Sequence, residues 1–241
     1  MILTLEKVNT FYGRSHILQG ISVELGEGEL VLLIGRNGVG KTTTLKTIMG
    51  VQAPSSGKIL FNEEEITGLR PHKIARKGIA YVPEERRIIP NLTVFENLKL
   101  GMLIRGKLAR DEINETIDEV FGYFPRLKER IHHRGDNLSG GEQQMLAIAR
   151  GMVSKPKLIL IDEPTEGLMP ILVAEIAEIL KKLLKIGVAV FLVEQNYDMA
   201  FNLSEKARVY IMEKGSICHH APVSEIINNR EPLEKFCGVN L

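Results

Sequence analysis

Cysteine, net charge and long apolar runs are all scarce in this sequence. The two cysteines, Cys218 and Cys237, lack the spacing of metal ligands, which argues against a cysteine-based metal site. The 31 basic and 30 acidic side chains nearly cancel, so no overall field attracts the chain to nucleic acid or anionic lipid. No apolar run approaches the roughly 20 residues that span a bilayer, and the N-terminus lacks a signal-peptide pattern. We therefore expect a protein of the reducing cytoplasm with no nucleic-acid partner.

The sequence does contain a regular series of predicted strands and helices. Apolar and polar residues alternate in 2–8 and 17–25, which predicts half-buried antiparallel strands. Short apolar runs without alternation predict strands buried on both faces of a sheet covered by helices. These runs are residues 30–35, 79–83, 157–162, 188–194 and 208–213. Helical periodicity follows Lys41, continues through 93–130, follows Gly141 and fills 171–185.

This order of elements predicts a single α/β domain over residues 1–241. Its mixed sheet would have an antiparallel β edge and an inserted α-helical lobe. Residues 1–83 and 151–241 are the predicted catalytic core, and 84–150 are the predicted lobe. Residues 214–241 are predicted to form a short C-terminal extension with a hairpin and terminal helices.

The segment GRNGVGKTT, residues 35–43, lies between a predicted buried strand and a predicted helix. That order is the one a phosphate-binding loop requires, because glycines turn the backbone N–H groups and the helix start toward one anion. Lys41 would reach the β- and γ-phosphates, and the Thr42 hydroxyl would complete a Mg²⁺ shell. The candidate nucleotide-binding residues of this loop are Gly35, Asn37, Gly38, Gly40, Lys41, Thr42 and Thr43.

Two adjacent carboxylates end the predicted strand LILID, at Asp162 and Glu163. Ligands of open α/β sheets bind at this end of the strands. Because side chains alternate along a strand, Asp162 would reach Mg²⁺ while Glu163 would orient or deprotonate a water molecule. The alternative is a solvated strand end.

A second glycine cluster, Ser139, Gly140 and Gly141, precedes another predicted helix. It offers exposed backbone donors and a hydroxyl at a helix start. One nucleotide does not need two such cradles, so we expect this cluster to close on the γ-phosphate held by a partner subunit. The alternative is an ordinary helix cap.

The segments GRNGVGKTT, LSGGEQQ and LILIDEP, in this order, resemble the nucleotide-binding subunit of an ABC transporter over essentially the whole chain. The resemblance implies a P-loop NTPase of ABC type with a RecA-like core, bound ATP and Mg²⁺, and ATP-driven head-to-tail dimerisation with a second ATPase subunit. It also implies transmembrane permease subunits and a peripheral place on the cytoplasmic face of the inner or cell membrane. Tyr12 would stack on adenine, the alternative being an ordinary edge-strand aromatic.

The segments YVPEERRIIPNLTVFENLKLG, EQQMLAIAR and LVEQN resemble the shorter ATPase of importers for branched-chain amino acids and related amides. The segments YGRSHILQG and DEPTEG are similar to the urea and short-chain amide branch of these importers. That likeness implies an indirect partner, a solute-binding protein, and leaves the second ATPase as the same chain or a similar one. Two alternatives stay open. One is an exporter ATPase for lipopolysaccharide or drugs, and the other is a soluble ABC ATPase that acts on ribosomes or nucleic acid.

Three positions depart from the general pattern of that family. Glu84 stands where a glutamine usually contacts Mg²⁺ and water, and Met169 stands where an aspartate is common. Gln195 stands where a histidine usually contacts the γ-phosphate, and its amide donates a hydrogen bond but carries no proton near neutral pH. We therefore expect Glu163 to be the base, with Gln195 and Glu84 assisting, and Mg²⁺ to be held by Thr42, Asp162 and Glu84. The charged residues 85–87 would either compensate for the Glu84 charge or be solvated.

Overall fold

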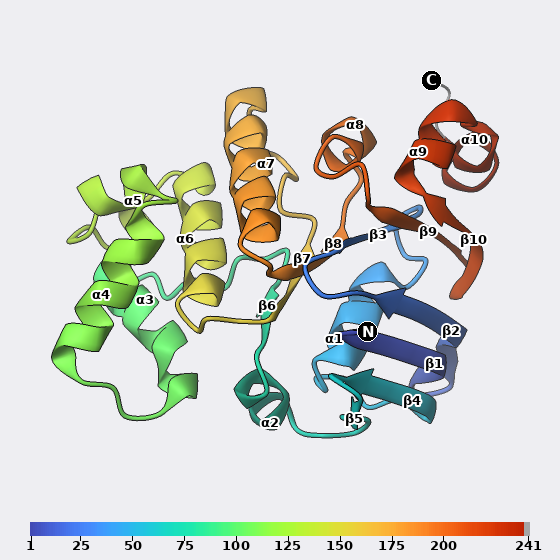
Figure 1. The fold of residues 1–241 in the computed structure, drawn as a ribbon, viewed down its shortest axis with the longest axis horizontal. Helices are drawn as coiled ribbons and strands as arrows, with labels where there is room; N and C mark the ends of the chain where they lie inside the picture. Colours follow the sequence, from blue (N-terminus) through green and yellow to red (C-terminus); the bar gives the residue numbers. More distant parts are fainter. Residues whose placement is uncertain (239–241) are drawn as a thin grey trace.

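The computed structural model describes residues 1–238, in which helices surround two β-sheets (Figure 1). The strands of the larger sheet are β3 (Leu30–Ile34), β6 (Ile79–Val82), β7 (Leu158–Asp162), β8 (Ala189–Val193), β9 (Arg208–Glu213) and β10 (Ser216–Pro222). Their order is β10-β9-β3-β8-β7-β6, and only β10 pairs antiparallel to its neighbour. The five strands expected from the short apolar runs are all confirmed.

The smaller sheet is antiparallel and lies beside the first. It contains β1 (Leu3–Tyr12), β2 (Ser15–Leu25), β4 (Ser56–Phe61) and β5 (Glu64–Glu65), in the order β2-β1-β4-β5. The first two strands were expected from alternation, whereas β4 and β5 were not. Leu3 of β1 lies opposite both Leu25 of β2 and Phe61 of β4. Pairing with β1 therefore stabilises β4 as a strand, although its sequence is too short to show a clear alternation.

Ten α-helices are present in the described part of the chain. They are α1 (Lys41–Ile48), α2 (Pro71–Arg76), α3 (Val94–Met102), α4 (Arg110–Phe121), α5 (Pro125–Glu129), α6 (Gly140–Met152), α7 (Pro170–Lys185), α8 (Tyr197–Phe201), α9 (Val223–Asn228) and α10 (Glu231–Cys237). The predicted helices are confirmed, while α2 and α8 are too short to show a period. Within residues 1–238, no helix has the length and apolar character needed to cross a bilayer.

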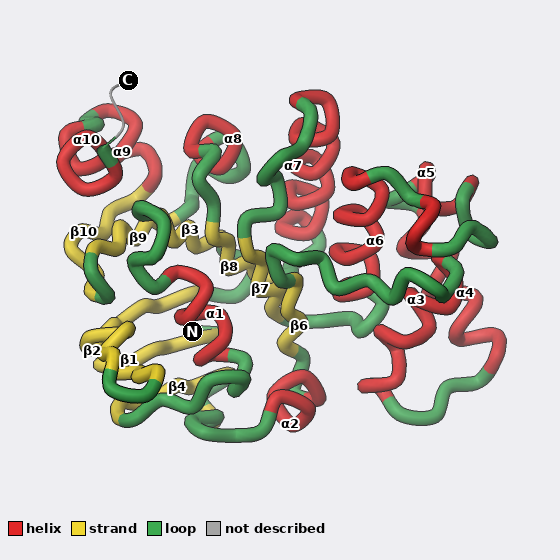
Figure 2. The backbone as a smooth tube through the Cα atoms, turned by 180° about the vertical axis from the view of Figure 1, so that it is seen from behind, coloured by secondary structure: helices red, strands yellow, loops and turns green. Residues whose placement is uncertain are grey.

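The helices α3, α4 and α5 lie at the opposite end of the molecule from the antiparallel sheet (Figure 2). The helix α6 ends at Met152, just past the expected lobe boundary at 150, and one buried cluster joins these helices to the larger sheet. The division into core and lobe therefore stays a prediction. At the C-terminus the expected hairpin forms between β9 and β10, so its first strand precedes residue 214, and the expected helices follow as α9 and α10. Residues 239–241 of the predicted extension lie outside the described residues.

The pleat of the larger sheet divides the buried core into two clusters. In β7, Ile159 and Ile161 face the cluster that contains α6 and α7, while Leu158 and Leu160 face the cluster that contains α1 and the antiparallel sheet. All five residues of β3, β7 and β8 are buried. Apolar residues without alternation are therefore required in these strands, because both faces are covered.

Candidate active site

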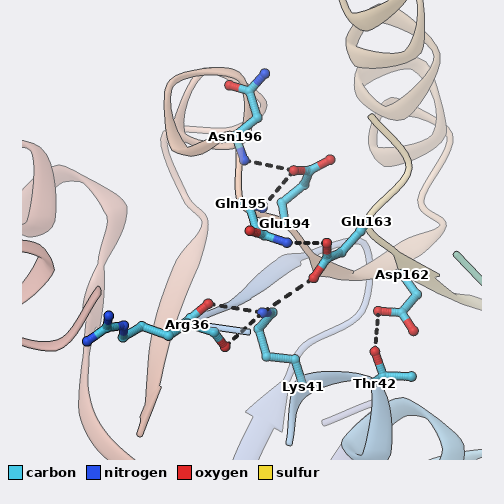
Figure 3. Close-up of polar contacts among 9 residues, drawn as sticks. Arg36, Lys41, Thr42, Asp162, Glu163, Glu194, Gln195 and Asn196 are labelled. Carbon is cyan, nitrogen blue, oxygen red and sulfur yellow. Dashed lines mark hydrogen bonds and ion pairs between the residues drawn. The ribbon is translucent and has the colours of Figure 1, made fainter. Parts of the chain in front are cut away.

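Four loops leave the same edge of the six-stranded sheet. They follow the carboxyl ends of β3, β6, β7 and β8, and they contain the glycine-rich segment 35–40, Glu84, Glu163 and residues 194–196. Ligands of open α/β sheets bind in the crevice outside these strand ends. The fold thus brings together residues that lie up to about 160 positions apart in the sequence, and Figure 3 shows eight of them at close range.

The glycine-rich loop holds Lys41 at the start of α1. Gly35 has a φ of 151°, and a Cβ built on it would lie 2.4 Å from the carbonyl oxygen of Met212, so only glycine fits. The Lys41 side chain is 4% exposed, and its Nζ donates hydrogen bonds to the carbonyl oxygens of Gly35 at 3.0 Å and Arg36 at 3.2 Å. The ammonium group is therefore pre-positioned over a loop whose backbone N–H groups suit a phosphate.

Glu163 lies between Lys41 and Gln195 (Figure 3). Its Oε1 is 3.3 Å from Lys41 Nζ, and its Oε2 accepts a hydrogen bond from Gln195 Nε2. The side chains of Lys41 and Glu163 are 4% and 9% exposed, so solvent screens this ion pair little. The ammonium group that we expect to bind phosphate is thus paired here with the carboxylate that we expect to act as the base.

Asp162 turns the other way from Glu163, toward α1. Its Oδ1 accepts a hydrogen bond from Thr42 Oγ1 at 3.2 Å, and its Oδ2 accepts one from Tyr81 Oη at 3.3 Å. Asp162 is fully buried, and this burial raises the pKa of its carboxyl group to about 6. A buried carboxylate beside a hydroxyl oxygen fits Mg²⁺, which usually keeps one or two protein ligands and takes the others from phosphate and water. No cluster of three or more acidic, histidine or cysteine ligands occurs within residues 1–238.

The raised pKa of Asp162 predicts an unusual effect of pH on stability without Mg²⁺ and nucleotide. Asp162 ionises near its ordinary pKa of 3.8 in the unfolded chain but only near pH 6 in the folded protein. Its contribution to stability is therefore present at low pH and is lost as pH rises through about 6, by roughly 3 kcal/mol. Asp162→Asn avoids that loss, so we expect it to be more stable than the wild type at pH 7 and to approach it near pH 4. Urea unfolding at both pH values measures the difference, and a difference that does not change with pH would contradict the expectation.

Glu84 lies near three other carboxyl groups at the mouth of the site. Burial raises the pKa of Glu84, and the nearby charges of Glu166, Glu163 and Glu85 raise it further. Both Glu84 and Glu166 line the hollow beside Lys41. Two carboxylates in contact favour sharing a proton or a cation over remaining doubly ionised. This arrangement is compatible with a cation beside Glu84, and its role as a Mg²⁺ ligand stays a prediction.

The hollow beside Lys41 has a volume of about 370 Å³ and a mixed polar and apolar lining. Tyr12, 44% exposed, lies on its rim, where an aromatic ring has room to stack on a base. The structure brings the expected nucleotide-binding residues of the first loop to this place. Those that line it directly are Asn37, Gly38, Gly40, Lys41, Thr42 and Thr43.

The second glycine cluster does not line this hollow. Ser139 is the N-cap of α6: its Oγ accepts a hydrogen bond from the N–H of Glu142, and its own N–H donates to Glu142 Oε2. The cap that the sequence analysis left as an alternative is therefore present. Ser139 and Gly140 are nevertheless exposed, whereas Gly141 is packed against Leu172. Closure on a partner's nucleotide stays a prediction for this cluster.

The charged residues 85–87 were expected either to compensate for the Glu84 charge or to be solvated, and the structure agrees fully with neither. Arg86 Nε donates to Gln144 Oε1 at 3.2 Å, and Arg150 of α6 donates to the Arg86 carbonyl oxygen at 3.0 Å. Arg87 forms an exposed pair with Glu85, 3.5 Å between Nε and Oε2. Instead of neutralising Glu84, Arg86 connects this loop to the helix that follows the second glycine cluster.

Sequence reasoning missed two acidic residues of the site, Glu166 and Glu194. Glu166 lines the hollow, and its spacing of three from Glu163 in a loop gave no periodic signal. Glu194 is 2% exposed at the end of β8. A charged residue that directly follows five apolar strand residues was the available signal, because such a group is buried only where it has partners.

Met169 lies at the N-cap position of α7 and makes no capping hydrogen bond with its side chain. The aspartate that the family pattern favours would cap this helix through its carboxylate. Met169 is instead 64% exposed, and Pro170 begins the helix. The departure therefore leaves an apolar side chain on the surface beside the Glu163 loop.

Sequence comparisons agree with the motifs. Residues 18–166 match the family model described as ABC transporter. The chain is 45% identical over 237 residues to the high-affinity branched-chain amino acid transport ATP-binding protein BraG of Pseudomonas aeruginosa, covering 98% of this chain and 100% of the relative. It is 35% identical to the probable branched-chain amino acid transport ATP-binding protein LivF of Archaeoglobus fulgidus, over 96% of each chain. The lipopolysaccharide export ATP-binding protein LptB of Escherichia coli is 31% identical, over 98% of this chain and 97% of the relative.

Solved structures share the same arrangement of sheets and helices. A nucleotide-free ATP-binding cassette from an ABC transporter superposes with a TM-score of 0.87 at 24% identity, covering 100% of this chain and 99% of the other. The dimeric, post-hydrolysis state of a cassette bound to ADP and Pi gives a TM-score of 0.82 at 27% identity, covering 92% of this chain and 98% of the other. The likeness thus covers both sheets and all the loops described above.

Proposed function

Because this chain belongs to the ABC transporter family and is an ATP-hydrolysing subunit of it, we propose that it powers an importer for branched-chain amino acids or related amides or urea. The observation that carries the ATPase mechanism is the convergence of Lys41, Thr42, Asp162 and Glu163 at one sheet edge. The similarity over the full length to the BraG and LivF subunits supports the cargo class.

We propose that the pair between Lys41 and Glu163 is the resting state of the site. The γ-phosphate and the Glu163 carboxylate compete for the compact positive charge of Lys41 Nζ. Binding of the phosphate would therefore break the ion pair between Lys41 and Glu163. The carboxylate, still oriented by Gln195 Nε2, is then available to accept a proton from the attacking water. In this proposal the Gln195 amide also lies beside the γ-phosphate, to which it donates a hydrogen bond without acid–base chemistry; its contact with Glu163 supports that role.

Magnesium fits the opposite side of the site, where Thr42 Oγ1 and the Asp162 carboxylate would hold it and Glu84 would approach from the mouth. Bound Mg²⁺ supplies charge neutralisation on the phosphate oxygens. The cation would favour the ionised form of Asp162 by compensating for its burial, and Thr42 would offer its hydroxyl oxygen as a ligand. Tyr12 binds the base in this arrangement, and the loop N–H groups bind the phosphates.

A second ATPase subunit completes the site in this proposal. Ser139 and Gly140 are exposed at the start of α6, and the hollow beside Lys41 is open. A partner's copy of this helix start would add backbone donors on the γ-phosphate from the free side. The dimeric cassette structure supports such an assembly for this chain.

Permease subunits have a candidate contact surface between the core and the helices α3 and α6. An open groove there is lined by apolar side chains, of which Val51, Ile89 and Leu100 are 56%, 42% and 40% exposed. Exposed apolar patches of this kind mark interaction sites. Contact with membrane-embedded permeases through this groove would hold the chain peripherally on the cytoplasmic face of the membrane, with a solute-binding protein acting on the far side.

Reconstitution tests the proposed function. The chain is combined with its cognate permeases and second ATPase in vesicles that contain ATP. Uptake of radiolabelled leucine and of urea is then measured with the cognate solute-binding protein outside. We expect ATP-dependent uptake of one of these substrate classes, and none when Val51 and Leu100 are replaced by aspartate. Extrusion of lipopolysaccharide or a drug instead would support the exporter, for which the LptB likeness is the argument.

A further inference from the structure

Glu194 is buried at the end of β8 and has no part in the reaction described above. Its Oε1 accepts hydrogen bonds from Thr165 N–H at 3.1 Å and from Thr165 Oγ1 at 2.6 Å. Its Oε2 accepts bonds from the N–H groups of Gln195 at 2.7 Å and Asn196 at 2.8 Å. One carboxylate thus joins the loop that follows Glu163 to the turn that carries Gln195. Its contacts with that turn are visible in Figure 3.

The Glu163 backbone needs such support. Its φ is 44°, in the left-handed region that non-glycine residues rarely adopt, and the next residue is Pro164. A conformation of this kind costs free energy and persists only where its surroundings impose it. On one side, Glu163 N–H donates to the Val193 carbonyl oxygen at 2.9 Å. On the other, Thr165 is held by Glu194, so the end of β8 fixes the chain both at and beyond Glu163.

We propose that Glu194 is a positioning residue that holds Glu163 and Gln195 in register with each other. Its two oxygens set the geometry of both partners at once: Oε1 fixes the Glu163 loop, and Oε2 fixes the turn from which Gln195 reaches Glu163. This inference rests on the proposed ATPase mechanism, because it assigns Glu163 the role of base.

The four accepted hydrogen bonds explain why a charged residue is buried here. Both oxygens of a carboxylate are acceptors, which matches four donors, whereas an amide has one acceptor oxygen and an NH₂ group that would face two N–H donors. Glutamine at this position keeps the volume but loses half of the acceptors. Valine at position 165 removes one donor, the hydroxyl, at nearly constant shape, while serine keeps that donor.

The test compares Glu194→Gln, Thr165→Val and Thr165→Ser in the complete transporter complex. A displacement of about 1 Å at a reacting group is enough to lower a rate about 100-fold. We therefore expect Glu194→Gln to lower kcat for ATP hydrolysis about 10- to 100-fold. Dissociation constants for ADP should stay within about twofold of the wild type, since Lys41 and the glycine-rich loop are untouched. Thr165→Val should lower kcat several-fold. Thr165→Ser keeps the hydroxyl donor and should therefore have nearly the wild-type kcat.

Two further measurements separate positioning from a general loss of folding. Glu205→Gln, an exposed carboxylate just beyond α8, is the matched control and should keep the wild-type kcat. The double variant of Glu194→Gln and Thr165→Val should lose less than the product of the single effects, because both changes act on one contact. Wild-type kcat in Glu194→Gln, equal losses of kcat and ADP binding, or failure of Thr165→Ser to restore activity would each overturn the inference. A wild-type complex without ATPase activity would instead overturn the proposed function.

Discussion

Replacing Glu163 by glutamine is expected to lower ATP turnover by about 10² to 10⁴-fold, the usual cost of losing a general base. Glutamine keeps the size of the side chain and its contact with Gln195, but it cannot accept a proton. ATP binding should persist and tighten, because the change removes a negative charge near the γ-phosphate and releases Lys41 from its pair at 3.3 Å. We therefore expect Glu163→Gln to accumulate as an ATP-bound dimer.

Steady-state hydrolysis and light scattering with and without ATP measure the two effects separately. Glu178→Gln, on the exposed side of α7, is the control for loss of a carboxylate elsewhere and should behave as the wild type. Undiminished hydrolysis in Glu163→Gln would show that another group takes the proton. Lost hydrolysis together with lost ATP binding would show that Glu163 acts on the fold of the loop rather than on water.

Replacing Lys41 by alanine is expected to weaken ATP binding by about 10- to 100-fold, the range for a hydrogen bond to a charged group. The 4% exposed ammonium group is the one cation that the structure places over the phosphate loop among the residues lining the hollow. Lys46→Ala is a matched control because it removes the same residue type from the same helix without touching the site. Calorimetric titration with ATP and Mg²⁺ measures both variants, and equal affinities would refute the role of Lys41.

Lys41→Ala should also act on the protein without nucleotide. It leaves the nearly buried Glu163 carboxylate without its cation, so we expect a lower thermal unfolding midpoint than for the wild type. The double variant of Lys41→Ala and Glu163→Gln should recover most of that loss, since no charge then remains unpaired. An additive result in the double variant would mean that the two side chains do not stabilise the fold as a pair.

The strongly apolar strands and the phosphate-binding motif were predictable from the sequence, because each has its own local physical cause. Strands β3, β7 and β8 are apolar because both their faces are covered, and Gly35 is glycine because a carbonyl oxygen lies where a Cβ would be. The role of Glu194 was not predictable. It depends on Thr165, which lies 29 positions away and reaches it only after β7 and β8 pair.

The departures from the family pattern were visible in the sequence, but their surroundings were not. A glutamine at position 195 gave no indication that its amide would contact Glu163 rather than solvent. Likewise, the charge of Arg86 suggested compensation for Glu84, whereas the structure directs it to Gln144. Long side chains at loop positions have several partners within reach, and only the folded chain selects one of them.

The two-sided burial of β7 makes Asp162 a marker of strand register. Leu158, Ile159, Leu160 and Ile161 are all aliphatic and all fully buried, so apolar burial alone barely distinguishes the observed pleat from one shifted by a single residue. Such a slip would carry the Asp162 carboxylate away from its hydroxyl partner Thr42 on α1 and into the apolar cluster under α6 and α7. Asp162, an expected Mg²⁺ ligand, would therefore also make a shifted register of β7 unfavourable, because the shift would bury its carboxylate among apolar side chains.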